Sequence, residues 1–167
     1  MEVVIALAIF SAAVVALAQV VLRAGEASAA SERTTVASVL ATEKLEQLRG
    51  LAWGYDEAGE HVQDLQSDAS REYVTDTGGL GRGLSGIDTL AQDVPGFVDY
   101  HDVTGRGLGH GGAAPAGTVL VRRWSVAALA DGPGETLVLQ VRVVRAPGGE
   151  EGWELARAAT LKTRRPR

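Results

Sequence analysis

Residues 3–22 read VVIALAIFSAAVVALAQVVL and contain no charged side chain. A helix of twenty residues spans about 30 Å, which is the thickness of the hydrocarbon core of a lipid bilayer. Ser11 and Gln19 are the only polar side chains in the run, and Arg23 ends it. We therefore expect residues 3–22 to form a transmembrane helix.

A cleaved secretory signal is the alternative for this run. The small residues Ala-Ser-Ala at 27–29 would suit a signal-peptidase site. However, the run is longer than the apolar region of most signal peptides, and no basic segment stands before it. We therefore favour a retained membrane helix.

The helical pattern continues beyond Arg23, because no proline occurs before Pro95. Apolar residues recur at spacings of three to five, which places them near one stripe of a helix that we expect to pack on the rest of the chain. They are Val36, Leu40, Leu45, Leu48 and Leu51. Lys44 and the other polar residues of 43–49 lie off this stripe, and Gly50 is a suitable helix stop. The sequence predicts one helix over residues 1–52, apolar all round in its first half and amphipathic in its second.

The remaining residues, 53–167, predict a β-rich globular domain. Residues 118–127, 136–145 and 153–163 have strand character, residues 96–103 could add a fourth strand, and short turns favour an antiparallel meander. Leu137, Leu139, Val141 and Val143 alternate with more polar residues, and the half-polar opposite face suggests partial cover there too. We predict an α+β fold in which the amphipathic half of the helix covers one face of a small antiparallel sheet.

Residues 78–117 hold 12 of the 21 glycines, so we expect a long surface loop there. The spacing G-x-G-x-x-G occurs at 81–86, but the strand and helix of a dinucleotide-binding unit do not flank it. His61, His101 and His110 are expected on loop surfaces, although Asp99 and Asp102 beside His101 could bind calcium.

We find no catalytic base with an orienting partner, no cysteine and no cofactor motif, so the sequence predicts no enzyme and no cofactor. We expect the tryptophans Trp53, Trp124 and Trp153 to be core or edge anchors. The net charge is −5, and residues 51–100 carry two basic and ten acidic side chains, which argues against a nucleic-acid partner.

The start of the chain, MEVVIALAIF at 1–10, followed by a long helix, resembles the N-terminus of type IV pilins and type II secretion pseudopilins. In these families a glutamate opens the apolar helix, and Glu2 stands at that position. Residues 40–49, LATEKLEQLR, resemble the end of the long helix in PilV-like minor pilins and GspI-like pseudopilins. Residues 121–126 and 160–162 resemble strands of the same group.

The resemblance implies a minor pilin or minor pseudopilin that is assembled into, primes or caps a type IV pilus or a type II secretion pseudopilus. Its partners would be other pilin or pseudopilin subunits, the prepilin peptidase and the bacterial inner membrane, with the globular domain in the periplasm. Glu2 would neutralise the N-terminal amine of a neighbouring subunit. We expect Met1 to be an internal methionine of the processing signal, whose basic leader, Gly and methylated Phe are missing from this sequence.

Two other classes of protein remain open. The first is a single-span, membrane-anchored periplasmic binding or scaffold protein that does not polymerise. The second is a secreted enzyme with an unusual signal peptide.

Overall fold

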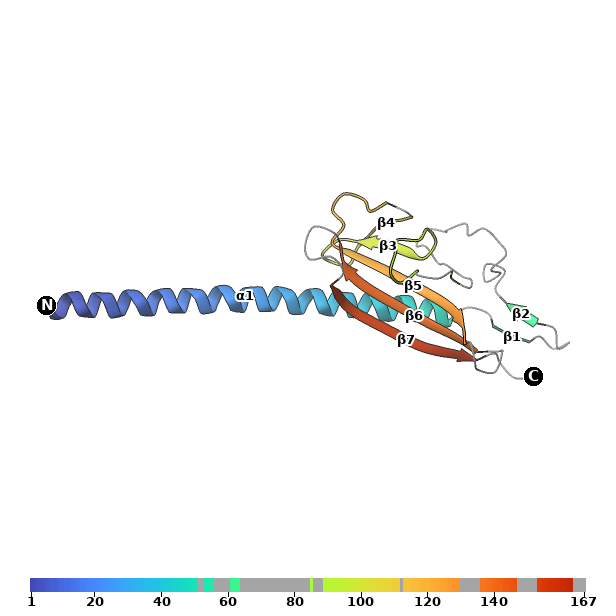
Figure 1. Cartoon of the computed structure of the whole chain (residues 1–167), viewed down its shortest axis with the longest axis horizontal. Coiled ribbons are helices and arrows are strands. Elements are labelled where there is room, and N and C mark those ends of the chain that lie inside the picture. Colours follow the sequence, from blue (N-terminus) through green and yellow to red (C-terminus); the bar gives the residue numbers. More distant parts are fainter. Residues whose placement is uncertain are drawn as a thin grey trace. The chain divides into compact units, whose positions relative to one another are not determined.

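The computed structural model describes residues 1–50, 53–55, 61–63, 85, 89–111, 113–129, 136–146 and 153–163. The chain has two structural units, residues 1–35 and residues 36–167. Among the described residues, the secondary structure is one helix and seven strands (Figure 1). They are α1 (Glu2–Arg49), β1 (Trp53–Tyr55), β2 (His61–Gln63), β3 (Val98–His101), β4 (Gly107–His110), β5 (Leu120–Ala128), β6 (Thr136–Arg145) and β7 (Glu154–Thr163). The α+β fold predicted from the sequence is confirmed.

Helix α1 is rich in alanine and contains no proline, so nothing interrupts its backbone hydrogen bonds over 48 residues. It ends at Arg49, directly before Gly50, the residue that the sequence indicated as a helix stop. The N–H of Gly50 donates to the carbonyl oxygens of Glu46 and Gln47, at 3.0 and 3.2 Å. The helix is long and apolar enough to cross a membrane.

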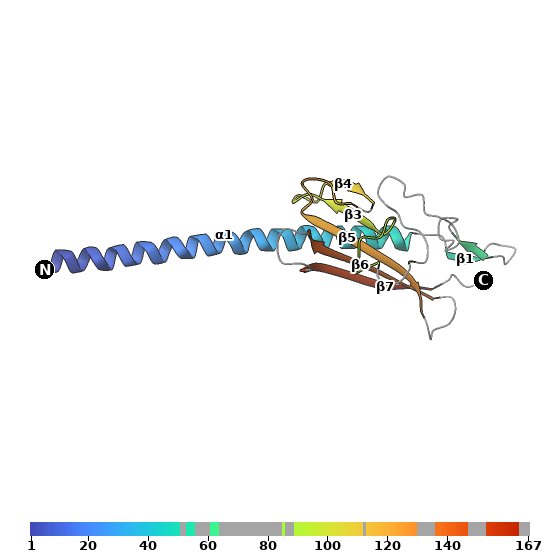
Figure 2. The ribbon, with the colours of Figure 1, turned by 45° about the horizontal axis from the view of Figure 1, so that its top comes forward.

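Five strands form one antiparallel sheet in the order β4-β3-β5-β6-β7 (Figure 2). The three predicted strands correspond to β5, β6 and β7, and they form a meander. The predicted fourth strand corresponds to β3, which pairs with β5 on one side and with β4 on the other.

The structure contains three short strands that the sequence did not predict. Within the region 78–117, expected to be a long surface loop, β4 pairs with the predicted strand β3 in a hairpin. Residues 53–63 contain the antiparallel pair β1–β2. The sequence signal was weak in both cases, because the strands are only three or four residues long.

The core of the second unit lies between the C-terminal part of α1 and one face of the sheet. The sheet contributes alternate residues, as its period of two requires. They are Leu120, Trp124, Val126, Leu137, Leu139, Val141 and Val143, and Phe97, which directly precedes β3, joins them. A second buried cluster on the opposite face contains Val98, Tyr100, Val121 and Val144, in agreement with the partial cover predicted for that face.

Strand β7 contains a β-bulge near its start. In the sequence Trp153, Leu155 and Leu161 stand at one parity, yet Leu155 packs against the core while Trp153 and Leu161 are exposed. The register shift between Val143 and Val144 in the β6–β7 ladder separates Leu155 from Leu161, because one extra residue exchanges the two faces of a strand. Ala156 and Ala158 also pack on the core. Trp153 is therefore no core anchor, whereas Trp124 is fully buried.

Candidate functional site

The first candidate site is the apolar surface of α1 over residues 3–22. Large apolar side chains along it are exposed on every side of the helix, from Val3 at 79% to Leu22 at 68%. The hydroxyl of Ser11 donates to the carbonyl oxygen of Leu7 at 2.7 Å, so this polar group is satisfied within the helix. Such a surface suits lipid or other apolar helices.

Glu2 is the first residue of α1 and is exposed. A carboxylate in the first turn interacts favourably with the partial positive charge of a helix N-terminus. Between Glu2 and Arg23 no other charge occurs. Glu2 is thus the single acidic group at the edge of the apolar surface.

The predicted packing residues of α1 lie toward the sheet. Leu40, Leu45 and Leu48 are buried in the core, and Val36 is partly buried against it. Ala37 and Ala41, which the apolar spacing did not identify, complete this face.

Lys44 was expected outside the packing stripe, and this expectation is wrong. Its side chain is fully buried, and Nζ lies 3.7 Å from the centroid of the Trp124 ring. The long aliphatic part of a lysine packs like an apolar side chain, and the aromatic face attracts its ammonium group. Phe97 packs beside Trp124, with their ring centroids 6.3 Å apart.

The second candidate site is a buried polar group of three residues, the Asp99–His101–Arg122 cluster. Asp99 and His101 lie on β3, and Arg122 lies on β5 directly opposite Asp99. Arg122 Nε donates to both oxygens of Asp99 at 2.9 and 3.2 Å, and Nη2 donates to Oδ2 at 2.6 Å. All three side chains lie on the sheet face that packs on the helix, because they alternate with the residues of the second cluster.

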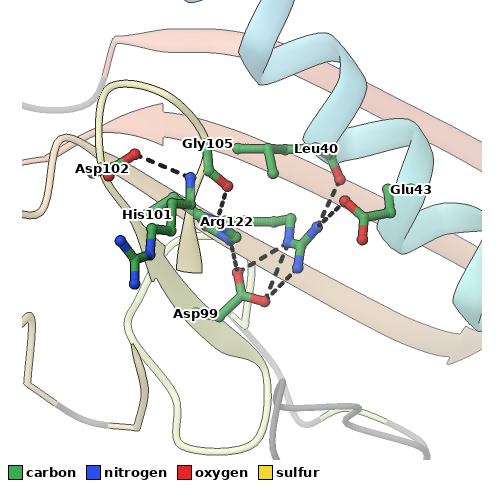
Figure 3. A network of polar contacts seen from close by, with 8 residues as sticks. Leu40, Glu43, Asp99, His101, Asp102, Gly105 and Arg122 are labelled. Atoms are coloured by element: carbon green, nitrogen blue, oxygen red, sulfur yellow. Dashed lines mark hydrogen bonds and ion pairs between the residues drawn. The ribbon is translucent and has the colours of Figure 1, made fainter. Parts of the chain in front are cut away.

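The cluster also reaches α1 (Figure 3). Arg122 Nη1 donates to the carbonyl oxygen of Leu40 at 3.0 Å and lies 3.7 Å from a carboxylate oxygen of Glu43. A guanidinium presents five N–H donors in a fixed plane, so it can serve a carboxylate and a backbone carbonyl together. Arg122 thereby joins β3, β5 and α1.

His101 is buried, which corrects its expected position on a loop surface. Its Nε2 lies 3.0 Å from Oδ1 of Asp99, and its Nδ1 lies 3.0 Å from the carbonyl oxygen of Gly105. His110, by contrast, is exposed on β4. His61 lies on β2 rather than in a loop.

The pKa of Asp99 reflects these contacts. Burial alone would raise the pKa of this carboxyl, but hydrogen bonds from His101 and Arg122, with the charge of Arg122, outweigh that effect. The pKa is therefore lowered below its ordinary value of 3.8, and Asp99 is ionised at neutral pH.

The calcium site considered for Asp99 and Asp102 is not formed. Asp99 turns to Arg122, while Oδ1 of Asp102 accepts hydrogen bonds from the backbone N–H groups of Thr104 and Arg106 at 2.8 and 3.0 Å. The Thr104 hydroxyl adds a third at 2.7 Å, and it lowers the pKa of Asp102. Among the described residues, no three acidic or histidine side chains come together to hold a metal ion.

Two further arginines hold the segment before β3. Arg123 forms an ion pair with Asp93 at 2.7 Å and donates to the carbonyl oxygen of Ala91 at 3.0 Å. Arg142, which stands opposite Arg123 in the β5–β6 ladder, donates to the carbonyl oxygen of Leu90 at 3.2 Å. These contacts fix residues 89–94 beside the sheet.

Sequence reasoning missed the Asp99–His101–Arg122 cluster. A usable signal existed, since Asp99 and Arg122 each interrupt an apolar run at a position of inward parity, and such residues of opposite charge on adjacent strands can pair. In comparisons with known proteins, no family model, no curated protein and no solved structure matches the chain.

Proposed function

We propose that this protein is a minor pilin or minor pseudopilin that is assembled into, primes or caps a type IV pilus or a type II secretion pseudopilus. The observation that carries the proposal is the division of α1 into two parts. Residues 3–22 expose apolar side chains all round, and Leu40, Leu45 and Leu48 are buried against an antiparallel sheet. This is the arrangement that the resemblance of residues 1–10 and 40–49 to the pilin-like families implies.

Such a subunit would first reside in the bacterial inner membrane, with residues 53–167 in the periplasm. After extraction, residues 3–22 would exchange lipid for the helices of neighbouring subunits. Both surroundings are apolar, so the exchange does not require the helix to enter water.

Glu2 would fix the register between neighbouring subunits. A carboxylate and an N-terminal ammonium attract strongly in a medium of low dielectric constant, and pairing offsets the cost of removing each from water. A subunit that is out of register would leave both charges unpaired. Glu2 therefore favours one axial position.

The proposal is tested by expressing the Glu2→Ala variant in the native host. The amount of the protein in the membrane fraction is compared with its amount in the sheared filament fraction. We expect the membrane level to be unchanged and the filament level to fall at least severalfold. Glu26→Ala is the matched control, because Glu26 is an exposed carboxylate of the same helix outside residues 3–22. Incorporation of Glu2→Ala at the wild-type level would contradict the role of Glu2.

A second measurement tests the family assignment itself. The N-terminal peptide of the native protein, isolated from its own membranes, is analysed by mass spectrometry. An N-methylated phenylalanine three residues before Met1 would support processing by a prepilin peptidase. An unmodified start at Met1 would instead favour the membrane-anchored scaffold that does not polymerise.

A further inference from the structure

Both ring nitrogens of His101 face oxygen atoms that accept hydrogen bonds. One oxygen belongs to the Asp99 carboxylate and the other to the Gly105 carbonyl, each at 3.0 Å (Figure 3). A carbonyl oxygen and an ionised carboxylate can only accept. A neutral imidazole carries one N–H and could satisfy only one of them, whereas the imidazolium form satisfies both.

A proton on Asp99 is the other way to satisfy this geometry, and Arg122 opposes it. Both oxygens of Asp99 already accept N–H groups from Arg122, at distances between 2.6 and 3.2 Å. A carboxylic acid proton would meet these donors. The lowered pKa of Asp99 points in the same direction.

Charged and titratable groups face His101 from every element packed around it. Asp99 belongs to its own strand, Arg122 to β5 and Glu43 to α1, while the hairpin turn contributes Asp102 and Arg106. His110 on β4 stands opposite Asp99. They comprise three carboxylates, two guanidinium groups and one exposed histidine. Among them, Asp99 contacts the ring of His101 directly.

We propose that His101 is a proton-dependent switch that fastens the turn of the β3–β4 hairpin to the helix-packed side of the sheet. When protonated, it joins the Gly105 carbonyl to Asp99, which Arg122 connects to the Leu40 carbonyl of α1. When neutral, one ring nitrogen turns a lone pair toward an oxygen lone pair, and one of the two bonds is lost. This inference does not depend on the proposed function.

The position of Gly105 links the hydrogen bonds of His101 to the contact between the turn and α1. Its φ is +86°, and a Cβ placed on it would lie 3.0 Å from Cγ1 of Val36. The turn thus rests directly against α1. Losing the His101 bond releases the Gly105 carbonyl at this contact.

The number of N–H groups on each histidine ring can be measured by NMR spectroscopy on the full chain in detergent micelles, with ¹⁵N-labelled histidine. The chain has three histidines, so the ring spectra remain simple. His101→Gln and His110→Gln assign the signals. We expect the His101 ring to carry two N–H groups when the turn is most protected, and a single N–H group when that protection falls.

Hydrogen–deuterium exchange then reports on the turn. The N–H of Asp102 donates to the Arg106 carbonyl, and the N–H of Gly105 donates to the Asp102 carbonyl. Relative to the unstructured rate at each pH, we expect both amides to lose about tenfold in protection as His101 deprotonates, which corresponds to about 1.4 kcal/mol. Amides of β6 serve as the internal reference.

The outcomes separate the switch from a purely structural histidine. In His101→Gln the protection of the turn should be low and independent of pH, and in His110→Gln it should follow the wild type. A His101 ring that carries a single N–H at every pH at which the sheet stays folded would overturn the proposal. Protection of the turn that stays constant while the His101 ring loses its second N–H would overturn it equally.

Discussion

At Arg122 a guanidinium group lies buried beneath α1, where Asp99 and the Leu40 carbonyl accept its hydrogen bonds. Burying a charge is costly unless it is paired, and the cost reappears when one partner is removed. The stability of the second unit should therefore depend more on Asp99 than on its exposed carboxylates.

Asp99→Asn tests this dependence. The variant leaves Arg122 buried without its counter-ion, and we expect the free energy of unfolding to fall by about 3 kcal/mol. Asp93→Asn is the control, because the Asp93–Arg123 pair is more exposed and should contribute less than about 1 kcal/mol. Urea unfolding in detergent, followed by tryptophan fluorescence, measures both. Equal losses in the two variants would contradict this account.

The lowered pKa of Asp99 also predicts how the stability of the fold changes in acid. A carboxyl whose folded pKa lies below its unfolded value stabilises the fold above that value and ceases to do so as the pH falls through the folded pKa. For Asp99 the contribution should be complete above the ordinary value of 3.8 and decline below it. Unfolding measured from about pH 5 to about pH 2 should be steeper for the wild type than for Asp99→Asn.

Alanine substitutions at three glycines separate the cost of backbone strain from the cost of steric crowding. Its positive φ disfavours any side chain by about 1–2 kcal/mol, and the contact with Val36 adds crowding, so Gly105→Ala should cost more than strain alone. Gly111→Ala meets strain at φ +114° with nothing within 4 Å, and Gly107→Ala meets neither. Thermal unfolding should rank the melting temperatures in the order Gly107→Ala, Gly111→Ala, Gly105→Ala, with the last the lowest.

Among the elements, the C-terminal part of α1 is stabilised mainly by the face that packs on the sheet. Leu48 is 1% exposed, so Leu48→Ala should cost about 3 kcal/mol through lost burial and the cavity it leaves. Val39 is 61% exposed on the same helix, and Val39→Ala should change stability by less than about 0.5 kcal/mol. Chemical unfolding of the two variants compares them directly. A similar loss for both would mean that the helix packs differently.

The sequence predicts those elements whose periodicity is long and regular. Helix α1 and strand β6 were recognisable because many apolar residues repeat at one spacing, as Leu137, Leu139 and Val141 do. In strand β7, residues of one parity do not share a face, because a β-bulge exchanges faces without leaving a mark in composition.

Within the candidate site, Lys44 and His101 were misplaced for a related reason. A polar residue type predicts exposure on average, while actual burial depends on which partner lies across the fold. Lys44 meets Trp124, which lies on a strand that only the tertiary structure brings to α1, and the Asp99 carboxylate beside His101 is held by Arg122 from the neighbouring strand β5. The proximity of Gly105 to Val36 is likewise a long-range feature that the spacing of residues in the sequence does not reveal.

For the whole molecule, the decisive feature is that one continuous helix serves two surroundings. The buried face of residues 36–49 is satisfied by the sheet, whereas the apolar side chains of residues 3–22 remain exposed. Water-soluble monomers rarely expose contiguous apolar surface of this extent. Residues 3–22 are long and apolar enough to cross a membrane.

Charges placed within residues 3–22 should release the protein from membranes. An arginine at the centre of a membrane helix costs about 2.5–3.5 kcal/mol, so Val14→Arg combined with Val15→Arg should oppose insertion by roughly twice that amount. The matched control is Val39→Arg combined with Thr42→Arg, since both residues are exposed on α1 beyond the apolar run.

Extraction of cell membranes with alkaline carbonate distinguishes the two double variants. The control should stay in the pellet with the wild type, because its apolar run is intact. The Val14 and Val15 variant should move largely to the soluble fraction or be degraded before it accumulates. Full retention of that variant in the pellet would show that residues 3–22 are not what holds the chain to the membrane, and it would remove the physical basis for assembly through this helix.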